Sequence, residues 1–190
     1  MTGGRPVGRG YSVAQTARLV CGLRWACGRL SEILGVWAAQ AAQGGGAHAA
    51  AAIRLAVLSR LLEAHRETLD GLQPDSELMA PWRLAAPADQ TLAAALDEIA
   101  ATEGPPERLA VAEEVFVPQL SGVYEQIGEH AAAHCDAALA SAARSLRHGL
   151  DRDTAAAGAG QTGAVGAADR ALSAAGGIVG PYLLKPEDWS

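Results

Sequence analysis

The sequence predicts an all-α protein folded as an antiparallel helical bundle. Ala and Leu supply most of its apolar residues, whereas β-branched and aromatic residues are sparse, a balance that favours helix over sheet. Apolar residues also recur every three or four positions over long stretches, and clusters of Gly and Pro separate these stretches. A chain of 190 residues is long enough to bury the core of one domain.

The first helix is expected from Val13 to Gln43. Residues 1–12 form a Gly- and Arg-rich tail, and Ser12 is well placed to cap the helix. The glycines at 44–46 should end it. Its buried stripe is Leu19, Leu23, Ala26, Cys27, Leu30, Leu34, Trp37 and Ala41.

A second helix is expected over residues 47–72, before Pro74. Three prolines and Trp82 make residues 73–87 an irregular crossing segment over the bundle, and a short helix should follow over 88–102. The stripe of the second helix is Ala51, Leu55, Leu58, Leu62, His65, Leu69 and Leu72.

A long helix should begin after Gly104, because proline is tolerated in a first helical turn. Pro118 should make it kink or restart. Beyond that point the helix continues, or turns into another, as far as about Asp153. The stripe there is Leu120, Val123, Ile127, Ala131, His134 and Ala138.

The C-terminal part, residues 158–190, is expected to be a flexible Gly/Ala-rich arm with an apolar tip. The predicted organisation is therefore a tail over 1–12, a bundle domain over 13–157 and this arm. The tip, YLLKPEDW, should dock either back on the bundle or on a partner.

Composition limits the partners and the compartment. The net charge of −6 gives no reason to bind nucleic acid or an anionic membrane surface. No signal peptide or membrane span is expected, and three cysteines without CxxC spacing fit a reducing cytoplasm. Abundant Ala, Gly and Arg, with Lys185 as the only lysine, indicate a bacterial source.

Long antiparallel helices with a crossing segment resemble the ferritin-like four-helix bundle over about residues 13–153. That resemblance implies a dimetal site of inward glutamates and Glu-x-x-His motifs, which this sequence lacks. Helical phase also points Glu32, Glu125 and Glu129 away from the apolar stripes. We therefore expect a degenerate member of the superfamily, without a di-iron centre.

Histidines on the inward stripes are the main candidates for chemistry. His130 and His134, four residues apart, would lie on neighbouring turns of one helix and, with His65 from a facing helix, could ligate a single Zn or Fe ion. The alternative is that His65 and His134 are core histidines that bind no ion. No other cofactor is implied.

The same histidines could instead act as acid and base in a metal-free pocket inside the bundle. Tyr124 and Glu113 lie near the edge of the same stripe, so the candidate catalytic set is His134, His65, His130, Tyr124 and Glu113. Apolar bundle interiors hold small molecules readily.

Trp25 lies on the outer face of the first helix, where a large aromatic usually covers something. It should pack under the crossing segment or the C-terminal arm, or anchor a homodimer.

Three functions remain open. The chain is a small metabolic enzyme or small-molecule-binding protein that uses the bundle interior, or a non-catalytic subunit or adaptor that acts through protein contacts. A histidine-ligated metalloenzyme is the third.

Overall fold

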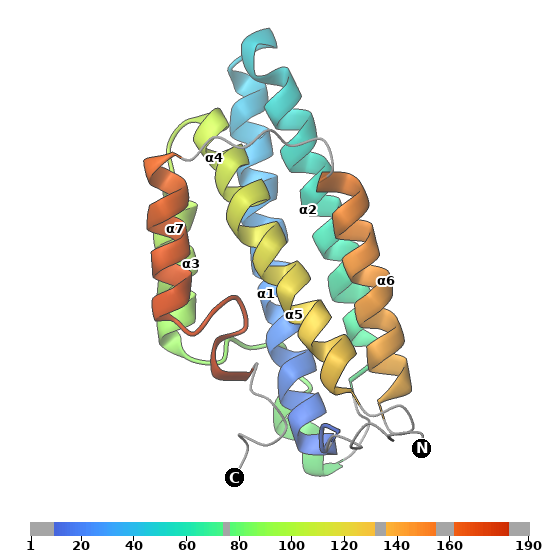
Figure 1. The fold of residues 1–190 in the computed structure, drawn as a ribbon. Coiled ribbons are helices and arrows are strands. Elements are labelled where there is room, and N and C mark those ends of the chain that lie inside the picture. Colours follow the sequence, from blue (N-terminus) through green and yellow to red (C-terminus); the bar gives the residue numbers. More distant parts are fainter. Residues whose placement is uncertain (1–9, 74–76, 132–135, 155–161, 183–190) are drawn as a thin grey trace, which may run out of the picture.

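The computed structural model describes residues 10–73, 77–131, 136–154 and 162–182, and its regular elements there are all helical (Figure 1). The fold class predicted from the sequence is thus confirmed. The α-helices are α1 Val13–Gln43, α2 Ala49–Asp70, α3 Gln90–Ala100, α4 Pro105–Val111, α5 Val117–His130, α6 Ala137–Thr154 and α7 Gly163–Ala174.

Helix α1 has the predicted bounds. The Ser12 side chain accepts a hydrogen bond from the Gln15 backbone N–H, and the Gln15 side chain accepts one from the Ser12 N–H, which satisfies two donors that the helix start leaves free. Gly44 ends the helix, and Gly45 makes the turn with φ of 73°. Helix α2 then packs antiparallel along α1, so the two form a long hairpin.

In its described residues, 73 and 77–87, the crossing segment is irregular, as predicted, apart from a short 3₁₀ helix over Glu77–Trp82. The Arg18 guanidinium lies 4.9 Å from the centroid of the Trp82 ring, a cation–π contact that fastens the segment to α1. Asp89 then caps α3 by accepting from the Leu92 N–H at 3.0 Å.

Helices α4 and α5 are joined through a π-helical turn over Ala112–Phe116. Here the Val117 N–H donates to the carbonyl of Ala112, five residues earlier. The sequence predicted a kink or restart at Pro118. The irregularity falls one turn earlier. Pro118 has no backbone N–H to donate to the preceding turn, so that turn can widen into a π-helix.

Helix α5 ends at His130, and Ala131 is extended with ψ of 130°. The stripe expected to continue through Ala131 toward Ala138 is therefore interrupted. Helix α6 forms the last long element of the bundle and packs on α5 and α2.

The Gly/Ala-rich C-terminal stretch contains a packed element that the linker interpretation missed. Thr162 caps helix α7, because its side chain accepts from the Val165 N–H, and the helix packs on α3 and α4. Ala168 and Leu172 are buried, and so are Ile178 and Val179 beyond the helix. Small residues bring α7 close to its neighbours, so Ala and Gly here reflect packing. The described part of the apolar tip, Tyr182, lies against Gly22 of α1, and residues 183–190 are outside the described residues.

The four long elements run up, down, down and up in the order α1, α2, α4–α5 and α6, with α3 and α7 on one side (Figure 1). The long connection through α3 lets α2 and α5 run in the same direction.

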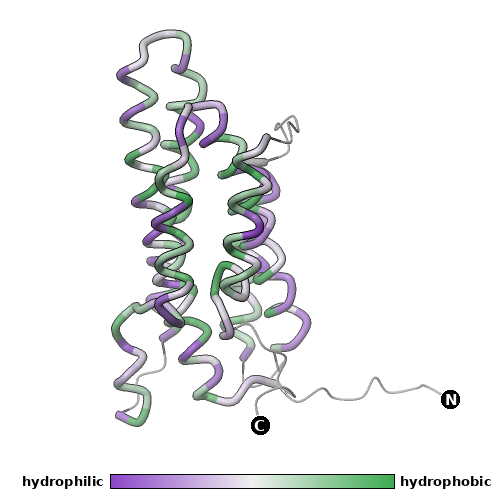
Figure 2. The backbone as a smooth tube through the Cα atoms, turned by 90° about the vertical axis from the view of Figure 1, so that its left-hand side faces the viewer, coloured by the Kyte–Doolittle hydropathy of each residue, from purple (hydrophilic) through white to green (hydrophobic). Residues whose placement is uncertain are grey.

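Hydrophobic and hydrophilic residues alternate along the helices, as expected where each helix buries one face (Figure 2). Trp37 stacks on Phe116 in the core, with centroids 6.1 Å apart, and its Nε1 donates to the Ala100 carbonyl. The up, down, down, up order of the long helices is compatible with a ferritin-like bundle.

None of the helices in the described ranges combines the length and the hydropathy needed to cross a membrane.

Candidate functional site

A chain of three polar side chains lies in the middle of the bundle. Cys27 from α1, Tyr124 from α5 and His65 from α2 are all buried, His65 with 2% of its surface exposed. The Tyr124 hydroxyl lies 3.2 Å from His65 Nδ1 and 3.6 Å from Cys27 Sγ. One consistent arrangement has the thiol donating to the tyrosine oxygen and the hydroxyl donating to the imidazole. The two rings also meet edge to face, with centroids 5.6 Å apart.

Burial holds all three groups in their neutral forms. It lowers the pKa of His65 from 6.5 to about 4, because charging the imidazole would leave an ion in an apolar interior. Burial also raises the pKa of the Cys27 thiol to about 12 and raises the pKa of Tyr124 well above its ordinary value. At neutral pH these three side chains carry no charge, and none of them is a thiolate nucleophile or a ready proton donor.

The structure brings together only part of the predicted catalytic set. His65 and Tyr124 meet directly, as the inward stripes implied. Glu113 instead belongs to the π-helical turn and forms an ion pair with Arg54 of α2, at 2.6 Å between Oε1 and Nε. His130 is half-buried at the last residue of α5. His134 lies outside the described residues.

The proposed histidine pair needed one continuous helix through residues 130 to 134. Helix α5 ends at His130 and Ala131 is extended, and residues 132–135 lie outside the described residues. Within the described ranges, no three His, Cys, Asp or Glu side chains are grouped to hold a metal. A site involving His134 remains a prediction.

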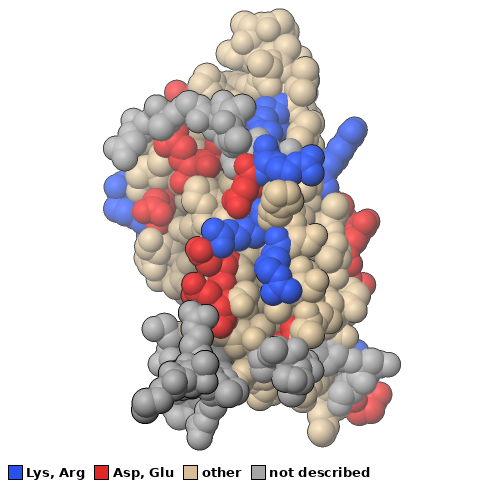
Figure 3. All heavy atoms as spheres, turned by 45° about the vertical axis from the view of Figure 1, so that its right-hand side comes forward, with Lys and Arg blue, Asp and Glu red and all other residues tan. Residues whose placement is uncertain are grey.

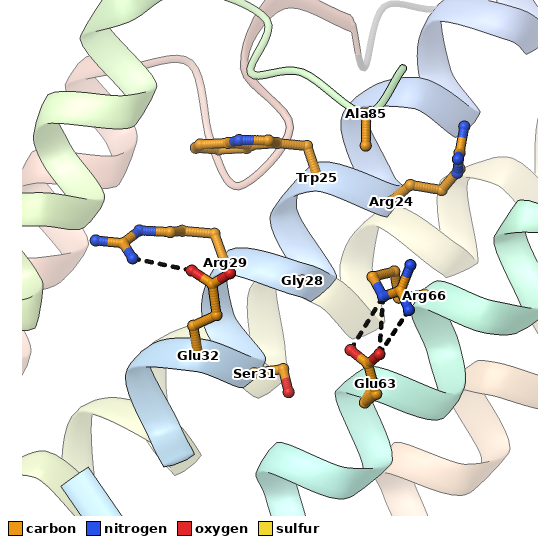
Figure 4. Close-up of a pocket in the computed structure, with 9 residues that line it drawn as sticks. All are labelled: Arg24, Trp25, Gly28, Arg29, Ser31, Glu32, Glu63, Arg66 and Ala85. Carbon is orange, nitrogen blue, oxygen red and sulfur yellow. Dashed lines mark hydrogen bonds and ion pairs between the residues drawn. The ribbon is translucent and has the colours of Figure 1, made fainter. Parts of the chain in front are cut away.

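Trp25 is half-buried and forms one wall of an open cleft of about 530 Å³ on the outer side of α1 (Figure 4). Trp25 and Arg29 extend to one side of the helix and Arg24 to the other, while Glu63 and Arg66 face the cleft from α2. Ala85 of the crossing segment completes the rim, so Trp25 is not an isolated aromatic on the surface. The full lining is Arg24, Trp25, Gly28, Arg29, Ser31, Glu32, Glu63, Arg66 and Ala85.

Ion pairs hold the arginines of this cleft in place. Arg24 bonds Asp70 and donates to the Arg83 carbonyl at 2.9 Å. Arg29 lies between Glu32 and Asp97, at 3.1 and 2.7 Å. On α2, Arg66 pairs with Glu63 at 2.6 Å. Only Trp25, an aromatic out of phase with its stripe, indicated that a site lay beside them.

A second, apolar groove of about 460 Å³ lies between α1 and α2 near their connection. We call it the tip groove. Its floor is made mostly of alanines, and Ile53 on its rim is 66% exposed. Its lining is Gly35, Ala38, Ala39, Ala42, Ala52, Ile53, Ala56, Ser59 and Arg60.

Comparisons with protein-family models, curated proteins and solved structures gave no match to this chain.

Proposed function

We propose that this protein is a non-catalytic helical-bundle subunit that acts through protein contacts made at the end of the α1–α2 hairpin. The observation that carries the proposal is a long uncharged surface. From Ile33 to Ile53 the chain has no Asp, Glu, Lys or Arg, although its net charge is −6. We call this segment the hairpin tip.

The hairpin tip projects beyond the other helices, where it is open to a partner (Figure 1). It is free of charged side chains on the face shown in Figure 3. Val36 and Val57 are 55% and 42% exposed, and Ile53, which lines the tip groove, is 66% exposed. Interfaces are depleted of charge at their centres, so this surface has the composition of one.

The interior offers less support for catalysis. His65, Tyr124 and Cys27 satisfy one another's hydrogen-bonding groups, and polar groups satisfied in this way need no ligand. Neither the Trp25 cleft nor the tip groove is lined by any of the three.

The partner we propose is a second copy of this chain. Two copies of net charge −6 repel each other wherever acidic side chains meet, but the hairpin tips carry no acidic side chain, and Arg60 is the one charged residue among those that line the tip groove. Alanines on the groove floor let helices approach closely, and Ile53 and Val36 of one copy can fill the groove of the other. A two-fold axis would bury the same patch on both.

Light scattering coupled to gel filtration, over a range of concentrations, tests this proposal. We expect a dimer that Ile53→Glu converts to a monomer, because the substitution places a charge in the contact. The matched control is Leu78→Glu, since Leu78 is 81% exposed but lies on the crossing segment. A monomeric wild type, or a dimer that survives Ile53→Glu and is lost in Trp25→Ala, contradicts the contact proposed here.

We also infer that the bundle is ferritin-like and has lost its dimetal centre. The helix directions and the long connection support the relationship, and Glu32, Glu125 and Glu129 are exposed, as helical phase predicted. Elemental analysis of the purified protein by plasma mass spectrometry tests this. Two iron or manganese ions per chain would contradict the loss of the dimetal centre. A single zinc or iron ion that is absent from His130→Ala would support the predicted histidine site.

A further inference from the structure

The Trp25 cleft combines a size, a charge and an aromatic wall that suit one class of ligand. Its volume of about 530 Å³ lies in the range of small-molecule sites, roughly 300 to 1,000 Å³. None of its residues belongs to the tip groove, so its role is independent of the contacts proposed above.

The lining gathers three arginines within an acidic protein. Arg24, Arg29 and Arg66 contribute three positive charges, and Glu32 and Glu63 contribute two negative ones, which leaves a net charge of +1. The other partners, Asp70 and Asp97, hold Arg24 and Arg29 but do not line the cleft. The largely buried Arg24 guanidinium group is therefore held in position before any ligand arrives, which lowers the entropic cost of binding.

The three arginines differ in how easily a ligand can reach them. The Arg24 side chain is only 11% exposed, and its Nε is buried without a hydrogen-bond partner in the described part of the chain. Arg66 is 38% exposed, and its partner Glu63 is 43% exposed. Exposed ion pairs contribute at most about 1 kcal/mol, so an incoming anion can displace Glu63 from Arg66.

Gly28 keeps the middle of the cleft open. A Cβ atom at this position would lie 3.1 Å from Cδ of Arg66, so any larger residue would push the arginine side chain away. On one side of Gly28 lies the Trp25 ring, and on the other lie Arg66 and Arg24 (Figure 4). An aromatic wall and a guanidinium group thus flank an open floor.

We propose that this cleft binds a small aromatic monoanion, with its planar ring against Trp25 and its carboxylate on Arg66. Guanidinium groups recognise carboxylates through paired hydrogen bonds, and an indole ring stacks on planar apolar groups. A cation would meet three arginines against two glutamates in the lining, and an anion without a ring would leave the Trp25 wall unused.

Nuclear magnetic resonance titration with benzoate tests the proposal, followed through the indole N–H signal of Trp25, which Trp25→Phe identifies. We expect a saturable shift in the millimolar range or below. Benzylamine, the matched cation, should give none, and inorganic phosphate should bind more weakly than benzoate.

Two variants of the ion pair should change affinity in opposite directions. Arg66→Gln removes the guanidinium group and should weaken benzoate binding about five- to tenfold. Glu63→Gln removes the competing carboxylate and should tighten it about two- to threefold. Arg144→Gln, an exposed arginine of α6 outside the cleft, should have no effect. Circular dichroism checks that each variant is folded.

Absence of a saturable benzoate shift overturns the site. Equal binding of benzylamine overturns the choice of an anion, and phosphate binding as tight as benzoate overturns the aromatic part. An unchanged affinity in both Arg66→Gln and Glu63→Gln overturns the assignment of the carboxylate to Arg66.

Discussion

His65 Nδ1 and the Tyr124 hydroxyl lie 3.2 Å apart at a point where three helices meet, and the two groups form a hydrogen bond inside the core. The contact joins α2 to α5, and Cys27 extends it to α1. Three helices are thereby fixed in register by groups that would be costly to bury singly. We infer that these three hydrogen-bonded side chains have a structural role and favour one packing of the bundle.

Tyr124→Phe should destabilise the protein by about 1–3 kcal/mol, because it leaves His65 and Cys27 buried without a partner. Urea denaturation of both proteins, followed by circular dichroism, measures the difference in the free energy of unfolding. Thr68→Ala, which removes an exposed hydroxyl on α2, is the control and should stay within about 0.5 kcal/mol.

The double variant Tyr124→Phe, His65→Leu separates the lost hydrogen bond from the cost of an unpaired imidazole. Because replacing both partners by apolar groups leaves nothing unsatisfied, it should lose less stability than the two single variants added together. Additive losses would show that the two side chains are not coupled.

Acid should weaken the fold through His65. The imidazole has a pKa of about 4 when folded and about 6.5 when unfolded, so below pH 6.5 the unfolded chain binds a proton that the folded one does not. The stability from neutral burial is therefore complete above pH 6.5 and is lost as the pH falls toward 4. The loss is about 1.4 kcal/mol per pH unit and about 3 kcal/mol in all.

Unfolding free energies at pH 7, 6, 5 and 4.5, for the wild type and for His65→Gln, test this titration. The variant cannot bind the proton, so the gap between the two proteins should narrow as the pH falls. His148→Gln, which replaces an exposed histidine on α6, is the matched control. A His65→Gln gap that is independent of pH would assign the acid sensitivity to other groups.

Periodicity predicted the parts of this fold that depend on long amphipathic helices. Helix α1 was bounded correctly, because Ser12 caps it and three glycines end it. The stripe of α2 correctly placed His65 in the core. The same stripes placed Trp37 among the buried residues. These features follow from which face of a helix avoids water, and that information is local.

Features that depend on neighbouring elements were not predicted. Helix α7 was read as a linker because its alanines and glycines carry no strong stripe, yet they suit close packing on α3 and α4. The Trp25 cleft joins residues from α1, α2 and the crossing segment, a combination that no single periodic pattern contains. The widened turn at Ala112–Phe116 needed knowledge of how the chain adapts ahead of Pro118.

The packed position of α7 predicts that the C-terminal region contributes to global stability. Leu172 is fully buried, so Leu172→Ala should cost about 2–5 kcal/mol, from lost burial and the cavity left behind. Its exposed neighbour provides the control, since Ser173→Ala should change the free energy of unfolding by less than about 0.5 kcal/mol. Equal effects in chemical denaturation would mean that α7 does not belong to the cooperative core.

Two adjacent glycines in the α1–α2 connection should respond oppositely to alanine. Gly45 has φ of 73° and ψ of −160°, a conformation that L-residues avoid, so Gly45→Ala should cost about 1–3 kcal/mol although no atom lies within 4 Å of the added Cβ. Gly46 also has open space but no positive φ. Gly46→Ala should therefore be neutral or stabilising by up to about 1 kcal/mol, because it restricts the unfolded chain. Thermal unfolding of both variants measures the contrast, and equal midpoints would show that this connection is not held in the conformation that sets the hairpin tip.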